Sequence, residues 1–317
     1  MPMFDNYLSG LQDWRDKAES NLRGEKSWLA LLELFWFDHG ANSFGSHPSN
    51  AIVFPKGKSP EHIGTFELKA GVVHLHPQPG ISITVDGKDA NDTVLKPDVS
   101  GEPSEMQVDG LVMMVVQRGE RFGLRVWDHN NPRRKNFPGR IWYDPSESYL
   151  AQARFSTYEP TREIPITNIL GDTSDTPLAG YVQFDLDGHA NRLDALESAG
   201  GRLFIIFKDQ TSQQETYPAG RYLYTDAPSD GKVLLDFNRA YNPPCAFTDF
   251  ATCPLPPYQN HLPYGLKPAN GLRSLLDNTR SHYLNKRPAL SGACSLIGLP
   301  SAIPLERVRR QLRQLLA

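Results

Sequence analysis

Four arginines share one short segment of the chain with an acid and several aromatic residues. They are Arg125, Arg133, Arg134 and Arg140, and Asp128 lies among them. A guanidinium can hold a carboxylate or a phosphate through two parallel N–H donors, and it can stack on an aromatic ring. The segment therefore predicts an anion-recognition loop. The alternative is a structural crossover in which the arginines pair with Asp128 and with backbone carbonyls.

A second group of polar side chains lies in and before the proline-rich loop 236–257. The prolines exclude a helix or a central strand there, because each lacks an amide donor and restricts φ. Planar donors, amides, phenols and a carboxylate together suit a polar or anionic small ligand. The same groups could instead form a network that holds an irregular loop. The residues are Tyr217, Arg221, Asp236, Asn238, Arg239, Tyr241 and Asn242.

Cysteines and histidines offer a weaker pattern. Cys245, Cys253 and His261 are evenly spaced, but a structural zinc site wants four ligands at closer spacing. We expect both thiols to be structural, buried or joined as a disulfide; a catalytic thiol would need His261 as its base. His74 and His76 should share one strand face without a third ligand. We therefore predict neither a metal nor a cofactor.

Composition limits the classes of function. The chain has 317 residues and a formal net charge of -3, which gives no nucleic-acid signature. Three cysteines, no signal peptide and no long apolar run lead us to expect a soluble cytoplasmic protein. The tail 266–317 differs, with nine Lys and Arg against two Asp and Glu. Its end, Leu305–Leu316, is predicted to form a basic amphipathic helix; the oligomeric state is not indicated.

The elements that must position these residues are mostly strands. Apolar spacing predicts a helix over 7–23 and a second short helix or helical turn over 25–38. Many short strands follow, with Asp86-Gly87 and Asp187-Gly188 as hairpin turns. We expect a mainly β protein with two sandwich-like or barrel-like halves. The predicted regions are 1–40 (helical), 41–128 and 129–265 (both β-rich), and the tail 266–317.

The expected strands and the strand pair around Arg118–Arg121 follow from alternating apolar residues between turn signals. The candidate strands are 51–54, 64–68, 72–76, 81–85, 111–117, 123–128, 150–155, 163–168, 181–186, 190–196, 203–208, 216–217, 222–225 and 233–237.

The first half also resembles a forkhead-associated phosphopeptide-binding sandwich. Gly45, Ser59, His62 and Asp86-Gly87 carry that resemblance, and Ser46 stands where an arginine usually follows the first glycine. The resemblance implies a β-sandwich for this half of the chain, and the missing arginine weakens what it implies about phosphopeptide binding.

A more specific resemblance covers about residues 10–262 and is carried above all by the proline-rich loop. The chain resembles the bacterial and archaeal domain-of-unknown-function 1684 family. The resemblance implies a layout but no activity, and it departs at His261, where arginine is common, and in the tail. The matching marks are Trp14-Arg15, Trp28-Leu29, Asn42 to Ser46, Gly64 with Phe66, Arg125 with Asp128, Phe137 to Arg140 with Trp142, Ala153 to Phe155, Gly220 to Leu223, and Leu235 to Asn260.

These patterns lead to two hypotheses. The first is a small-molecule binding protein or uncharacterised enzyme, whose arginines orient a carboxylate or a phosphate, with Asp128 or Asp236 as the nearby acid or base. The second is a non-catalytic protein-interaction or structural module, in which the same residues brace the loop.

Overall fold

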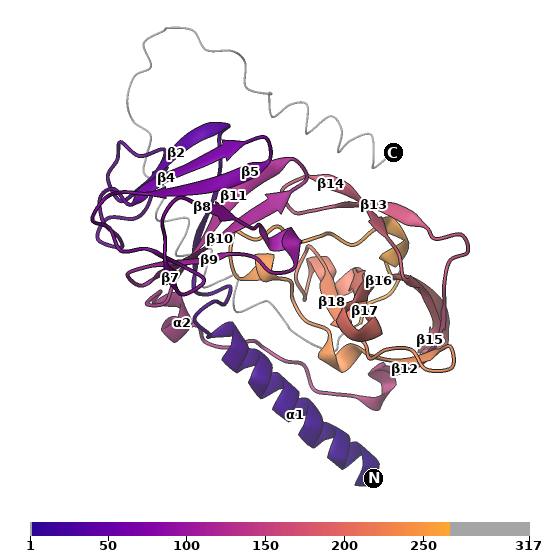
Figure 1. Ribbon diagram of the computed structural model, residues 1–317. Coiled ribbons are helices and arrows are strands. Elements are labelled where there is room, and N and C mark those ends of the chain that lie inside the picture. The colour runs from indigo at the N-terminus through magenta and orange to yellow at the C-terminus, as the bar shows by residue number, and fades with distance from the viewer. Residues whose placement is uncertain (1, 267–317) are drawn as a thin grey trace, which may run out of the picture. The chain divides into compact units, whose positions relative to one another are not determined.

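One long helix precedes a series of β-strands, which pair almost entirely antiparallel (Figure 1). The computed structural model describes residues 2–266. The predicted C-terminal helix, the rest of the basic tail and Cys294 lie outside the described residues. Helix α1 spans Pro2–Leu22 and confirms the helix predicted over 7–23. Leu11 and Leu22 are buried on its apolar face, as their spacing indicated.

Two facing sheets form the N-terminal half. Their inner faces share one core, to which Phe44, Phe66 and Leu75 contribute from one sheet, and Met113 and Leu124 from the other. The larger sheet has the order β1 (Leu31–Trp36), β11 (Arg121–Asp128), β10 (Leu111–Arg118), β9 (Glu105–Val108), β6 (Thr84–Val85) and β7 (Lys88–Asp89). The smaller has the order β3 (Ile52–Val53), β2 (Gly40–Gly45), β4 (Gly64–Lys69), β5 (Val72–Pro77) and β8 (Thr93–Leu95).

The helix predicted over 25–38 is wrong. Leu31–Trp36 form strand β1 instead, which pairs antiparallel with the edge of β11, with Trp36 opposite Gly123. A short apolar run does not by itself distinguish a buried helix from a strand. The edge of β11 decides the conformation of Leu31–Trp36, because pairing with it satisfies the backbone donors and acceptors of β11 that would otherwise be unpaired.

The two Asp-Gly turns are confirmed. Val85 pairs with Lys88, and Leu186 pairs with His189, so each hairpin closes through a two-residue loop. Both residues of each loop have positive φ, between 52° and 77°. That is the backbone which type I′ hairpins require and which Asp-Gly supplies.

One six-stranded sheet builds the C-terminal half around a second core. Side chains from every strand of the sheet enter that core, among them Ala151, Val182, Leu193, Ile205 and Leu235. The predicted strand 216–217 is wrong: Thr216 lies in a turn, where its amide donates to Thr211. The sheet order is β18 (Arg221–Tyr224), β17 (Arg202–Phe207), β16 (His189–Ser198), β15 (Gly180–Leu186), β12 (Leu150–Ser156) and β19 (Lys232–Asp236).

A two-stranded ribbon and several single helical turns complete the described fold. The ribbon consists of β13 (Glu163–Thr167) and β14 (Thr173–Pro177). The short helices are α2 (Arg133–Asn136), η1 (Asp98–Ser100), η2 (Glu147–Tyr149), η3 (Ala199–Gly201), η4 (Gln210–Gln213), η5 (Phe237–Arg239), η6 (Pro244–Ala246) and η7 (Tyr258–Asn260).

The proline-rich loop contacts both faces of the C-terminal sheet. Phe237 and Ala240 are buried in the core on one face. Tyr241 then pairs with Tyr222 through two backbone hydrogen bonds of 2.9 Å, which extend the edge of β18. Cys253 packs against Tyr222 in a cluster that includes Ile206, whose side chain points away from the core that Ile205 enters. The loop thus protects a sheet edge without being a strand.

The predicted fold class, mainly β with a helical N-terminus, is confirmed. Within residues 2–266 no helix is both long and apolar enough to cross a membrane.

A tight approach of the backbone at Gly220 yields the first prediction. A Cβ there would lie 2.6 Å from the Phe207 carbonyl oxygen and 2.6 Å from Cγ of Pro256, at a φ of +96°. Strain and overpacking together should make Gly220→Ala lower the free energy of unfolding by about 2–4 kcal/mol. Gly188→Ala, at positive φ but with nothing within 4 Å, should cost only about 1–2 kcal/mol. Equal shifts in urea unfolding would contradict the packing argument.

A histidine on β5 yields a pH prediction. His74 and His76 share a strand face as expected, with ring centroids 6.2 Å apart. His76 Nδ1 lies 2.9 Å from Oδ1 of Asp92, and its Nε2 lies 3.4 Å from Oε2 of Glu67. The hydrogen bond to Asp92 is the main cause of a raised His76 pKa. This pair therefore stabilises the fold below about pH 6.5, the unperturbed value, and the effect disappears as pH rises through the folded-state pKa.

We expect an NMR titration to place the His76 pKa above its usual range and Asp92→Asn to lower it. Asp175→Asn, an exposed acid on β14, is the matched control and should leave the pKa of His76 unchanged. A His76 pKa that does not respond to loss of Asp92 would contradict the assignment.

Candidate functional site

A cavity of about 580 Å³ is lined by α1, by the residues that follow it and by the proline-rich loop. We call it the basic cavity, because four of its lining residues are cations and none of its described lining residues is an acid. The cations are Lys17, Lys26, Arg140 and Arg202. The aromatic lining residues are Trp14, Trp28, Tyr241 and Phe247.

Two of the four cations of the basic cavity form salt bridges with carboxylates that do not line it. Glu105 holds Lys26 at 2.5 Å, and Glu19 holds Arg140 at 3.1 Å. Lys17 is exposed and forms no salt bridge within residues 2–266. Arg202 is exposed too, and its Nε donates to the Thr225 carbonyl at 3.0 Å. Two of the four positive charges are therefore not neutralised by a neighbouring described carboxylate.

Arg140 combines burial with unused hydrogen-bonding capacity. Its side chain is 9% exposed, and the guanidinium carbon lies 5.2 Å from the centre of the Phe247 ring. Burial lowers the pKa of Arg140, and the charge of Glu19 opposes that shift. Its Nε is buried without a hydrogen-bond partner among the described residues, as is Oδ1 of Asn242, another lining residue. Such atoms are rare in folded proteins and call for an explanation.

Arg221, in contrast, is part of the interior. It forms a fully buried salt bridge with Asp209, and the two side chains are 1% and 0% exposed. Its guanidinium also donates to the Leu266 carbonyl at 3.0 Å and lies 5.1 Å from the Phe207 ring centre. Arg221 is not among the residues that line the basic cavity.

The other predicted residues of the 125–143 segment are held by rings and carbonyls. Arg125 lies 5.2 Å from the ring centre of Trp28 and 5.9 Å from that of Trp127, and burial lowers its pKa to about 10. Asp128 pairs with Lys58 at 2.7 Å. Arg134 donates to the backbone carbonyls of Arg23 and His129. The contacts of Arg134 with carbonyls match one part of the crossover alternative, but the partner of Asp128 is Lys58 and not an arginine.

The predicted residues at the start of the loop brace it as well. Asp236 accepts from Tyr7 at 2.9 Å and pairs with Arg239 at 3.1 Å, while burial raises the pKa of Asp236. The amide of Asn238 makes two 3.0 Å hydrogen bonds with the backbone of Ser146. Tyr217 donates to the Cys245 carbonyl at 2.8 Å, and burial raises the pKa of this phenol.

Three of the predicted residues therefore line the basic cavity, namely Arg140, Tyr241 and Asn242. Sequence reasoning missed Lys17 on α1, Lys26 in the turns that follow α1, and Arg202 on β17. One signal was present for α1: Trp14 and Lys17 are three residues apart and so share a helix face.

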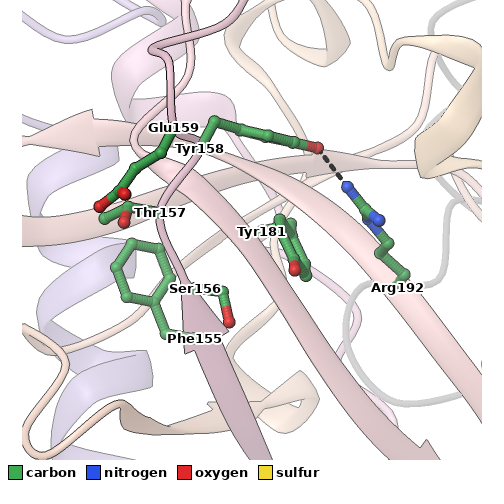
Figure 2. A pocket seen from close by; sticks show the side chains of 7 residues that line it. All are labelled: Phe155, Ser156, Thr157, Tyr158, Glu159, Tyr181 and Arg192. Atoms are coloured by element: carbon green, nitrogen blue, oxygen red, sulfur yellow. Dashed lines mark hydrogen bonds between the residues drawn. The ribbon is translucent and has the colours of Figure 1, made fainter.

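A second, open hollow of about 690 Å³ lies at the end of β12 (Figure 2). Its cation, Arg192, lies 3.7 Å above the centre of the Tyr181 ring and donates to Tyr158 Oη at 2.5 Å. Tyr158 in turn donates to Asp194 at 2.6 Å. Arg192 is therefore engaged by Tyr158 and Tyr181, and Glu159 adds a negative charge to this lining, which the lining of the basic cavity lacks among the described residues.

The described residues contain no group of three His, Cys, Asp or Glu side chains that could hold a metal ion. Cys245 and Cys253 are free thiols. His261 is exposed and bridges to the backbone of Lys208.

Comparison with protein families matches a region of the chain that includes the proline-rich loop. Residues 135–267 match the family described as "Protein of unknown function (DUF1684)". The chain belongs to this family. The DUF1684 match is shorter than the predicted 10–262, but it includes the whole proline-rich loop and Arg140, Arg202, Tyr241 and Asn242 of the basic cavity.

One solved structure similar to this DUF1684 chain is the solution NMR structure of an uncharacterized protein from Haloarcula marismortui. It is 32% identical, the match covers 44% of this chain and 79% of that chain, and the TM-score is 0.37. No curated protein matches the chain.

The buried pair of Arg221 and Asp209 predicts a stability effect. Asp209→Ala should lower the free energy of unfolding by about 3–5 kcal/mol, because it leaves a guanidinium buried without its carboxylate. Asp172→Ala removes a surface partner of Arg121, where the side chains are 37% and 46% exposed, and should cost at most about 1 kcal/mol. Chemical unfolding of both variants measures the difference. If both variants lost a similar amount of unfolding free energy, the stabilising role of the buried Asp209–Arg221 pair would be contradicted.

Proposed function

We propose that the protein binds an anionic small molecule, a carboxylate or a phosphate, in the basic cavity. The observation that carries the proposal is the imbalance of charge in its lining, with four cations and no acid among the described lining residues. Low-dielectric walls strengthen the field of such a cluster and raise the local concentration of anions.

The lining also suits the rest of a small ligand. Trp14, Trp28 and Phe247 offer apolar and aromatic surface, while Asn242 offers an amide. The volume of about 580 Å³ lies within the usual range for small-molecule sites. We therefore expect a ligand with one anionic group for the cations and a planar or apolar part for the rings.

Binding rather than catalysis is proposed. The described lining contains no carboxylate, imidazole or thiol, which are the commonest acids and bases at neutral pH. Its one phenol, Tyr241, has a raised pKa because it is buried, so it stays protonated. The cavity supports recognition of an anion more directly than a proton transfer.

Charge-removing variants test the proposal. A calorimetric and thermal-shift screen with phosphates, sugar acids, nucleotides and aromatic carboxylates should find an anion that stabilises the protein and binds less tightly as salt increases. Lys17→Gln and Arg202→Gln should each weaken its affinity about tenfold or more, as expected for one charge-assisted hydrogen bond.

Arg192→Gln is the matched control, because Arg192 lines the other hollow and its loss should leave the affinity unchanged. The proposal fails if no anion stabilises the protein, or if all three variants weaken binding equally.

The alternative, a non-catalytic interaction or structural module, has one observation in its favour. Arg134, Arg221 and Asn238 use their donors on the protein's own carboxylates and carbonyls. A screen in which no anion binds would support this alternative.

A further inference from the structure

The two cysteines of the proline-rich loop face each other. The amide nitrogen of Cys245 donates to Sγ of Cys253 at 3.2 Å, so the sulfur of one cysteine lies against the backbone of the other. Both side chains pack in the same apolar cluster, next to Tyr222. A disulfide needs the two Cβ atoms about 3.5–4.5 Å apart. Because Sγ of Cys253 already lies 3.2 Å from the Cys245 amide nitrogen, little backbone movement is needed to join the two sulfurs.

The backbone around each thiol is anchored, which keeps the sulfurs together. Cys245 lies in the helical turn η6 directly after Pro243-Pro244, and its carbonyl accepts from Tyr217 at 2.8 Å. Cys253 precedes Pro254, and its carbonyl accepts from the amide of Ile169 at 2.8 Å. These backbone hydrogen bonds therefore hold the two cysteines close to each other.

The thiols differ in access. Cys253 is 4% exposed, whereas Cys245 is only partly buried. The hydrogen bond between them lowers the pKa of Cys245 and raises that of Cys253, to which burial also contributes. A more accessible cysteine with a lowered pKa beside a buried thiol is the arrangement of an attacking and a resolving cysteine.

We propose that Cys245 and Cys253 are a reversible dithiol–disulfide pair, oxidised by a low-molecular-weight disulfide such as oxidised glutathione. The Cys245 thiolate attacks one sulfur of oxidised glutathione, which forms a mixed disulfide and releases one glutathione thiolate. Cys253 gives its proton to that thiolate and attacks Sγ of Cys245. This step closes the protein disulfide and expels the second glutathione. Two protein thiols are oxidised and one small disulfide is reduced to two thiols.

The mixed disulfide favours the second step. The charge of Cys245 is one cause of the raised pKa of Cys253. Once Cys245 is in the mixed disulfide, it no longer carries a charge that opposes ionisation of Cys253. The disulfide does not depend on anion binding in the basic cavity.

Peptide mapping of the full chain tests the pair without any substitution that could disturb folding. After equilibration with oxidised glutathione, we expect a peptide that links Cys245 to Cys253 and is lighter by two hydrogens than the reduced pair. Dithiothreitol should restore both thiols. In the Cys294→Ser background, maleimide labelling of unfolded protein should count two thiols before oxidation and none after it.

Single variants test the order of attack. Cys253→Ser should retain one glutathione on Cys245, whereas Cys245→Ser should take up little, because Cys253 is buried. Thiols that both remain reactive in oxidised glutathione would overturn the proposal, as would linkage of either cysteine to Cys294 or to another chain. Faster modification of Cys253 than of Cys245 would overturn the assigned order.

Discussion

The packing of Trp28 joins the parts of the structure on which the basic cavity depends. Its indole contacts three apolar clusters, to which Leu22 contributes from α1, Leu31 from β1, and Cys253 from the proline-rich loop. Arg125 covers its ring at 5.2 Å, and the same ring lines the basic cavity. A large aromatic side chain that touches several elements fixes their spacing, because close-packed interiors tolerate little change in volume. The placement of Lys17 and Tyr241 on a common cavity follows from that spacing.

Several arginines donate hydrogen bonds to carbonyl groups of the irregular backbone, and others do not. A loop without a hydrogen-bonded ladder leaves carbonyl groups that must find donors when they are buried. Arg23, Arg133 and Arg134 supply such donors to Phe137, Phe247 and His129. Arg140 is different, because its neighbours are rings and one carboxylate, and it lines the basic cavity. Its Nη1 donates to Glu19, whereas its Nε has no partner among the described residues. Arg140 is thus held by a side chain of α1 rather than by the carbonyls of the irregular backbone.

The sequence predicted local structure well and long-range packing poorly. The Asp86-Gly87 and Asp187-Gly188 turns were found because their conformation is encoded by the two residues themselves. The strand at Leu31–Trp36 was missed because the edge of β11, nearly a hundred residues away, decides its conformation.

The same limit applies to the candidate site. Arg140 and Arg221 both follow a glycine in aromatic surroundings, yet one lines a cavity and the other is buried against Asp209. Nothing local distinguishes them, because the partner of Arg221 lies on the preceding connection and is brought to it by the pairing of β17 with β18.

The prolines explain how a segment without regular structure can form part of a cavity wall. Ordering a residue costs roughly 1–2 kcal/mol of backbone entropy, and proline reduces that cost because it restricts the unfolded chain as well. Pro243 and Pro244 lie between Tyr241 and Phe247, which both line the basic cavity. The pairing of Tyr241 with Tyr222 holds one end of this stretch, and the contact of Cys245 with Cys253 holds the other. A wall restrained at both ends is already ordered in the free protein, so the proposed binding would not have to supply the entropy of ordering it.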